Sequence, residues 1–173
     1  GQHFRDADNN AVAQDTVVGP PRRYQWRGEP QWQRSHLAMP SINSMVSTNG
    51  RLLTVEDLAS AEHPALPGKQ ALVARDAFNG VGLWKRPLHD WFKALYPLKS
   101  GPGWLPRRLV AVDDRVYLAP GVGQDLLCLD AVTGEVLCTY PETASPFELV
   151  VSDGIVLAAV DPDILHRRTV RTQ

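Results

Sequence analysis

Short apolar runs, rich in β-branched residues and interrupted by glycine and proline, follow one another along most of this chain. Asn49-Gly50 and Asp153-Gly154 favour the positive φ angles of a two-residue hairpin turn, and Asp113-Asp114 holds the same place between two other runs. The pattern therefore predicts short antiparallel strands joined in hairpins. The three hairpin stretches are "SMVSTNGRLLTVE" (44–56), "RLVAVDDRVYLAP" (108–120) and "ELVVSDGIVLAAV" (148–160).

The spacing of these hairpins indicates a repeat. Val46, Val110 and Val150 hold equivalent places before the three turns, 64 and 40 positions apart. Compared with the second unit, the first contains an insert of ten residues before Asp76 and another of fourteen after it. Without the inserts the period is 40 residues, with two hairpins in each unit. This period is typical of a β-propeller blade, which is a four-stranded antiparallel sheet.

A second phrase marks the closing hairpin of each unit: "VARDAFNGVGLWKR" (73–86) and "LCLDAVTGEVLCTY" (127–140). We expect Asp130 and Thr133 to accept backbone N–H bonds across the turn, and Gly134 to adopt a positive φ angle. The phrase is thus interpreted as a structural turn. The corresponding residues of the first unit are Asp76, Asn79 and Gly80.

These phrases resemble the repeats of the pyrroloquinoline-quinone (PQQ)-like β-propellers, a family that includes quinoprotein alcohol dehydrogenases and the outer-membrane-assembly propeller lipoprotein. The opening residues also look like the start of a bacterial subgroup of these proteins, and the resemblance covers about residues 3–160. It implies an all-β fold of PQQ-like propeller blades. The best-matching stretches are "ALVARDAFNGVGLWKRPL" (71–88) and "LLCLDAVTGEVLCTY" (126–140).

The cofactor chemistry of that family does not carry over to any residue of this chain. The quinone-using members place two adjacent cysteines over the cofactor and a calcium ion beneath it, whereas Cys128 and Cys138 are ten positions apart. PQQ and calcium are therefore expected as cofactors only if the chain is part of a dehydrogenase whose catalytic blades lie elsewhere. The resemblance alone suggests a periplasmic or exported protein, and the compartment stays open.

The repeat divides the chain into a lead-in segment, two complete units and the start of a third. A closed propeller needs about four to eight blades to bury its sheet edges. We therefore expect a fragment of a longer protein, or a chain that assembles with copies or with another segment. The predicted bounds are 1–45 for the lead-in, 46–109 for the first unit, 110–149 for the second and 150–173 for the incomplete third.

One insert has the pattern of a short helix. Between Pro87 and Pro97, apolar side chains recur with helical spacing, which predicts a helix near residues 88–96. This helix would pack on its own blade or, alternatively, dock a partner. Its apolar positions are Leu88, Trp91, Phe92, Leu95 and Tyr96.

The two cysteines occupy the repeat positions of Ala74 and Trp84, so they would face each other across one hairpin. A cross-strand disulfide is one alternative, if the protein is exported to an oxidising space. Two buried thiols that fill the hole left by the absent tryptophan are the other.

Composition and motifs narrow the functional classes. Acidic and basic residues number 19 and 18, which offers no electrostatic footprint for nucleic acid, and no run of 18 apolar residues could span a membrane. No residue stands out as catalytic, and the scattered histidines lack zinc-site spacing. Trp32, Arg34 and His36 form one unexplained polar and aromatic group.

Three functions are compatible with this pattern. The first is a non-catalytic propeller scaffold that binds a protein or a small ligand. The second is a segment of a PQQ-dependent alcohol or sugar dehydrogenase. The third is a propeller module fused to another catalytic domain.

Overall fold

The computed structural model describes residues 16, 17, 19, 22–28, 42–60, 62, 67–89, 91 and 105–161. Within this part of the chain, ten strands form two four-stranded antiparallel sheets and one two-stranded sheet. Each sheet follows the chain, so that neighbours in sequence are neighbours in space. The first sheet contains β1 (Ile42–Thr48), β2 (Arg51–Asp57), β3 (Gln70–Asp76) and β4 (Gly82–Pro87). The second contains β5 (Leu109–Val112), β6 (Arg115–Leu118), β7 (Leu126–Asp130) and β8 (Val136–Tyr140), and the third contains β9 (Pro146–Ser152) and β10 (Ile155–Val160).

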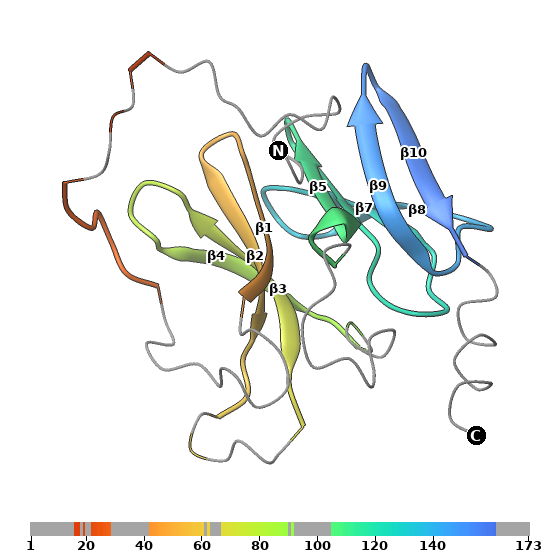
Figure 1. Ribbon diagram of the computed structural model, residues 1–173, viewed down its shortest axis with the longest axis horizontal. Coiled ribbons are helices and arrows are strands. Elements are labelled where there is room, and N and C mark those ends of the chain that lie inside the picture. The colour runs from red at the N-terminus through yellow and green to blue at the C-terminus, as the bar shows by residue number, and fades with distance from the viewer. Residues whose placement is uncertain are drawn as a thin grey trace.

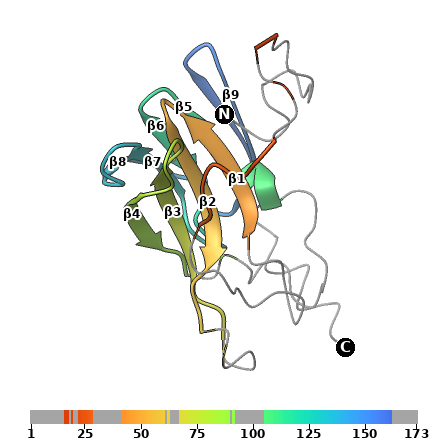
Figure 2. The same cartoon turned by 90° about the vertical axis from the view of Figure 1, so that its left-hand side faces the viewer.

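The three sheets are stacked in chain order (Figures 1 and 2). The short 3-10 helix η2 (Leu105–Arg108) leads directly into β5 of the second sheet. Two four-stranded meanders followed by the first hairpin of a third are the arrangement of consecutive β-propeller blades. The predicted all-β blade architecture is therefore confirmed. In the described residues, no helix combines the length and the apolar character needed to cross a membrane.

The three hairpin turns lie at the dipeptides that predicted them. Asn49 and Gly50 have φ angles of 42° and 72°, and Asp153 and Gly154 have φ angles of 50° and 76°. Asp113 in the second turn has a φ of 51°. These are conformations that glycine, asparagine and aspartate adopt at lower cost than other residues. Local turn chemistry thus sets the position of each first hairpin.

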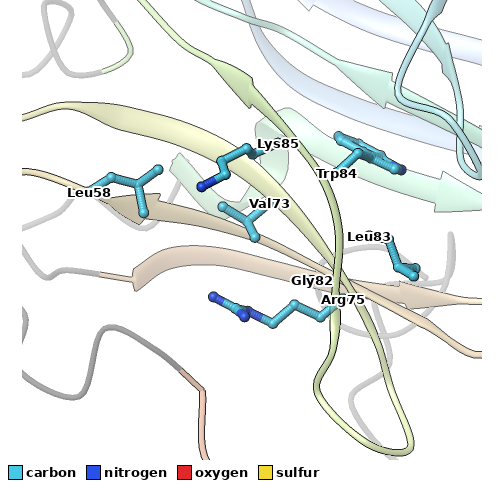
Figure 3. Close-up of a pocket in the computed structure, with 7 residues that line it drawn as sticks. All are labelled: Leu58, Val73, Arg75, Gly82, Leu83, Trp84 and Lys85. Atoms are coloured by element: carbon cyan, nitrogen blue, oxygen red, sulfur yellow. The ribbon is translucent and has the colours of Figure 1, made fainter.

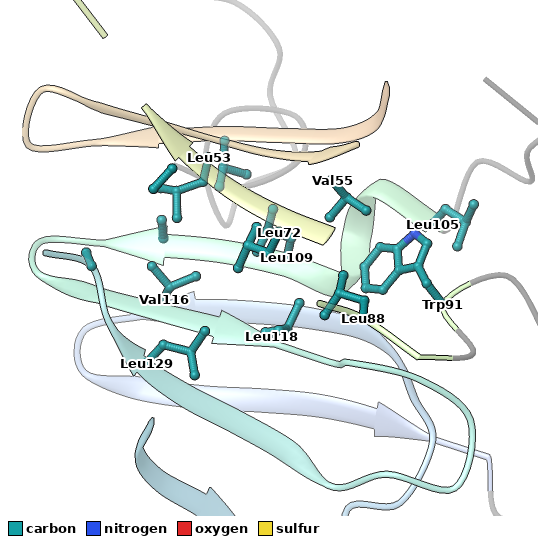
Figure 4. Packing of buried hydrophobic residues seen from close by; sticks show 14 residues of the cluster. Leu53, Val55, Leu72, Leu88, Trp91, Leu105, Leu109, Val116, Leu118 and Leu129 are labelled. Atoms are coloured by element: carbon teal, nitrogen blue, oxygen red, sulfur yellow. The ribbon is translucent and has the colours of Figure 1, made fainter. Parts of the chain in front are cut away.

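A first core fills the space between the first and second sheets (Figure 4). Alternate residues of β2, β3, β5 and β6 point into it, because side chains along a strand alternate between the two faces. Leu53 and Leu72 from the first sheet meet Val116 and Leu118 from the second. This contact holds two blades together as one apolar unit. Its other buried members are Val46, Val55, Ala74, Leu88, Trp91, Leu105, Leu109, Ala111, Leu129 and Ala131.

A second, smaller core lies between the second and third sheets. Tyr117 and Cys128 from one side pack with Leu149 and Val151 from the other. Since the second sheet contributes to both cores, its strands β5, β6 and β7 are covered on both faces, whereas β8 is largely exposed. Its remaining buried members are Val110, Ala119 and Leu126.

The predicted helix near residues 88–96 lies largely outside the described residues. Of its apolar positions, Leu88 and Trp91 are described, and both are buried in the first core. These two side chains pack inside the protein, as the blade-packing alternative expects. They are not available for docking a partner.

Arg108 is a cation buried beside this core. Its guanidinium lies 4.5 Å from the centroid of the Trp91 ring, and it donates hydrogen bonds to the carbonyl oxygens of Trp91 and Ala119 at 3.1 and 3.0 Å. Burial lowers the pKa of Arg108 to about 10, so it stays charged at neutral pH. The residue ties the insert to the second sheet by stacking and by hydrogen bonds.

We expect Arg108→Ala to lower the free energy of unfolding by about 3 kcal/mol, because it leaves two buried carbonyl oxygens and a cavity. Arg107→Ala is the matched control, since Arg107 forms a half-exposed ion pair with Glu148 at 2.9 Å, and its removal should cost less than about 1 kcal/mol. Denaturant unfolding of both variants measures the difference. Equal costs would contradict the structural role assigned to Arg108.

Candidate functional site

The repeated phrase forms the same turn in both complete blades. In the second blade, the Asp130 carboxylate accepts hydrogen bonds from the backbone N–H groups of Val132 and Thr133 at 2.7 and 2.9 Å. The Thr133 hydroxyl oxygen accepts from the N–H of Glu135, and Gly134 has a φ of 76°. Each predicted role in this turn is confirmed.

The first blade repeats this geometry with asparagine in place of threonine. Asp76 accepts from the N–H groups of Phe78 and Asn79 at 2.8 and 3.0 Å, and the Asn79 side chain accepts from the N–H of Val81. Gly80 has a φ of 77°. The phrase is therefore a structural turn in both places.

The hydrogen bonds from Thr133 and Val132 hold the pKa of Asp130 below its ordinary value. A carboxylate whose folded-state pKa is lowered stabilises the fold above the unfolded-state pKa, and this contribution is lost as pH falls through the folded-state value. The turn therefore keeps its hydrogen bonds throughout the neutral range.

A tryptophan from the preceding segment covers each of these turns. Trp84 in β4 reaches across to the second sheet, where its indole N–H donates to the carbonyl oxygen of Ala131 at 3.0 Å. A Cβ atom built on Gly134 would lie 2.7 Å from the Trp84 ring. Gly134 thus serves two purposes, since it supplies the positive φ angle and leaves room for the indole.

Trp26 covers the first turn in the same way. Its indole N–H donates to the carbonyl oxygen of Ala77 at 3.0 Å, and a Cβ atom on Gly80 would lie 2.5 Å from its ring. Trp26 belongs to the predicted lead-in segment, and no repeat phrase surrounds it. Sequence reasoning therefore missed its role. The matching Gly80 and Gly134 were a signal in the sequence for a shared docking surface.

The second blade lacks this tryptophan. Cys128 and Cys138 are direct partners across β7 and β8, as Ala74 and Trp84 are across β3 and β4. The predicted repeat positions of the cysteines are thus confirmed. Cys128 is buried but Cys138 is exposed, and both are free thiols. The expectation that two buried thiols fill the tryptophan's place is wrong for Cys138, because this side chain lies at the surface of the outer strand.

Tyr140 lies close to the cysteine pair. Burial and the neighbouring Cys138 raise the pKa of Tyr140 to about 12, and burial raises the pKa of the Cys128 thiol. Tyr140 and Cys128 are therefore protonated in the neutral range. Tyr140 packs against the second core, which places the pair at the margin between the second and third sheets.

A hollow of about 480 Å³ opens on the face of the first sheet that points away from the second. Val73 and Arg75 alternate along β3 with the core residues Leu72 and Ala74, so they face this hollow. Figure 3 shows Lys85 and Leu58 near Val73. The full lining is Leu58, Val73, Arg75, Gly82, Leu83, Trp84 and Lys85.

A buried ion pair lies beneath this hollow. Arg75 lies 3.4 Å from a carboxylate oxygen of Glu56, and the Thr54 hydroxyl donates to the other carboxylate oxygen. The charge of Arg75 is therefore balanced within the protein. Lys85 adds an exposed cation at the rim, so the hollow is weakly positive and partly apolar.

The third sheet presents a different surface. Leu157 in the third sheet is equivalent to Leu53 in the first and Tyr117 in the second. Each of the three stands four positions after the first residue of its hairpin turn. Leu53 is 0% exposed and Tyr117 6%, because the following sheet covers each of them, whereas Leu157 is 63% exposed. Ile155 lies on the same face and is 62% exposed.

Other groups considered in the sequence do not form a site in the described residues. Trp32, Arg34 and His36 lie outside them. Among the residues that are placed, no cluster of three or more histidine, cysteine, aspartate or glutamate side chains could hold a metal ion.

No protein-family model and no curated protein matches this sequence. Solved structures with a similar fold include the computationally designed Ika8 protein, at a TM-score of 0.45 and 13% identity over 69% of this chain. BamB from Moraxella catarrhalis matches at a TM-score of 0.43 and 13% identity over 68% of this chain. The chain spans 30% of the length of each of these two proteins.

We expect Gly134→Ala to destabilise the protein more than Gly154→Ala. Both glycines have a φ of 76°, but a Cβ atom at Gly154 meets nothing within 4 Å, whereas one at Gly134 meets the Trp84 ring. Backbone strain is therefore shared, and steric overlap should add about 1–3 kcal/mol at Gly134 alone. Chemical denaturation followed by tryptophan fluorescence measures both variants, and equal losses would contradict the docking of Trp84 on this turn.

Proposed function

We propose that this chain is part of a PQQ-like β-propeller that acts as a non-catalytic scaffold, and that its third sheet binds a further blade of the same kind. The two aspartates of the repeated phrase support the non-catalytic role. Asp76 and Asp130 accept hydrogen bonds from backbone N–H groups within their turns, which is a structural function. The binding role rests on the exposed face of the third sheet.

The exposure of Leu157 is the observation that carries the proposal. The same position is buried in the first two blades by the sheet that follows, and its exposure rises from 6% at Tyr117 to 63% at Leu157. Each blade in such a stack contacts only its neighbours. An apolar face without a neighbouring blade is therefore expected to bind one particular surface. That surface is the rear face of a following blade.

The edge of β10 supports the same partner. In the complete blades the second strand pairs with the first and the third, whereas β10 pairs with β9 alone among the described strands. An edge of this kind offers a row of backbone N–H and C=O groups to another strand. The partner would thus add strands to the third sheet as well as cover its face.

The division into units at residues 46–109, 110–149 and 150–173 belongs to this proposal. A ring of about four to eight blades requires more units than the described strands provide. The additional blades would come from a longer bacterial protein or from other copies of the chain. Trp26 fits this scheme, since it covers the first turn as the outer strand of a preceding blade would.

We expect the purified chain to self-associate through this open face, and Leu157→Lys to weaken the association at least tenfold. A charged side chain cannot be buried against an apolar sheet without a large desolvation cost. Phe78→Lys is the control, because Phe78 is 76% exposed at a turn, away from the face of the third sheet. Sedimentation velocity over a concentration series measures the association of all three proteins.

A compact monomer that melts cooperatively at every concentration would contradict the open-face proposal. Equal weakening by Leu157→Lys and Phe78→Lys would contradict the assignment of the face. Loss of association in the Leu157 variant alone supports it.

The non-catalytic part of the proposal is tested separately on the full-length protein. We expect titration with PQQ and calcium to give no saturable change in absorbance or fluorescence, and no dye-linked alcohol oxidation. Saturable cofactor binding together with alcohol oxidation would overturn the scaffold function in favour of a quinoprotein dehydrogenase.

A further inference from the structure

Cys128 and Cys138 face each other on the last two strands of the second blade, β7 and β8. Their Cα positions are direct partners in the antiparallel pairing of β7 and β8. Direct partners in such a ladder have Cα atoms about 4.5–5.5 Å apart, which lies within the range of about 4.4–6.8 Å that a disulfide spans.

The two thiols differ in their access to solvent. Cys128 is 1% exposed and belongs to the second core, whereas Cys138 is exposed. A reagent in solution therefore reaches Cys138 first. Among the described strands, β8 has one neighbour, which is β7. Small movements of β8 toward β7 are thus not opposed by a further strand.

We propose that Cys128 and Cys138 form a reversible cross-strand disulfide by exchange with a small-molecule disulfide such as glutathione disulfide, with Cys138 as the attacking thiol and Cys128 as the resolving thiol. This is a modification site, and it does not depend on the proposed scaffold function. The difference in exposure assigns the two roles.

The exchange proceeds in two balanced steps. The Cys138 thiol loses its proton to solvent, and its sulfur attacks one sulfur of glutathione disulfide, so that the S–S bond breaks and one glutathione leaves as the thiol. Cys128 then loses its proton and attacks the Cys138 sulfur, which releases the second glutathione. Two protein thiols are oxidised and one glutathione disulfide is reduced to two thiols.

The order of these steps follows from the surroundings of Cys128. The thiolate is the nucleophile in exchange, and burial raises the pKa of Cys128, which disfavours its thiolate. A mixed disulfide on Cys138 brings an electrophilic sulfur directly opposite Cys128. The second step is then intramolecular, so a high effective concentration offsets the low thiolate fraction.

The position of the pair gives the bond a structural consequence. Cys138 stands where Trp84 stands in the first blade, and Trp84 joins its strand to the next sheet through Ala131. The second blade has no indole at this place. A disulfide would instead join β8 covalently to β7 and would close a short loop around the Asp130 turn.

The test is incubation of the folded chain with glutathione disulfide, followed by intact-mass measurement. The wild-type protein should lose two hydrogen atoms and carry no stable adduct. Cys128→Ser should gain one glutathione, because the mixed disulfide on Cys138 cannot be resolved. Cys138→Ser should stay unmodified at least tenfold longer, because Cys128 is buried. Addition of reductant should restore the starting mass in each case.

Other outcomes would overturn the proposal. A stable glutathione adduct on the wild-type chain would show that Cys128 does not resolve the mixed disulfide. Rapid modification of Cys138→Ser would show that the roles are wrongly assigned, and complete lack of reaction in the wild type would show that no disulfide forms. Circular dichroism of each variant establishes that it is folded, and native iodoacetamide labelling of the wild type provides a second readout, with alkylation expected at Cys138 alone.

Discussion

One specific contact, the Trp84 indole on the Gly134 turn, joins the first two sheets alongside the apolar packing of the first core. The indole donates to the carbonyl oxygen of Ala131, and its ring occupies the space that any side chain at Gly134 would fill. Asp130 fixes that turn from within by accepting two backbone N–H bonds. The Asp130 turn, Gly134 and Trp84 therefore form a single structural contact, and this contact requires all three.

The alternation of side chains between the two faces of a sheet explains why the blades form a series. Strands β5, β6 and β7 of the second sheet present one face to the first sheet and the other to the third, and both faces are buried. The third sheet has the same alternation but leaves Leu157 exposed. The same geometry thus accounts for both cores and for the exposed face of the third sheet.

Much of this fold could be predicted because it is encoded locally. The hairpin turns at Asn49-Gly50 and Asp153-Gly154, and the hydrogen bonds of Asp130 and Thr133, depend on residues a few positions apart. The facing of Cys128 and Cys138 followed from the repeat alignment. Local chemistry and periodicity were sufficient for these features.

The contacts between distant segments could not be predicted in this way. Trp26 lies 51 positions from Ala77, whose carbonyl oxygen it binds, and nothing in the sequence around it repeats. The burial of Arg108 between the Trp91 ring and the Ala119 carbonyl depends on contacts with residues 17 and 11 positions away along the chain. The exposure of Cys138 depends on which strands lie beside β8.

A double-mutant cycle between Trp84 and Gly134 tests the central claim most directly. Trp84→Ala, Gly134→Ala and the double variant are compared with the wild type by denaturant unfolding. If the indole fills the space above the glycine, Gly134→Ala should cost less once the ring is gone, with a coupling free energy of about 1 kcal/mol or more. Additive losses would contradict the account, because the two residues would then stabilise the fold independently.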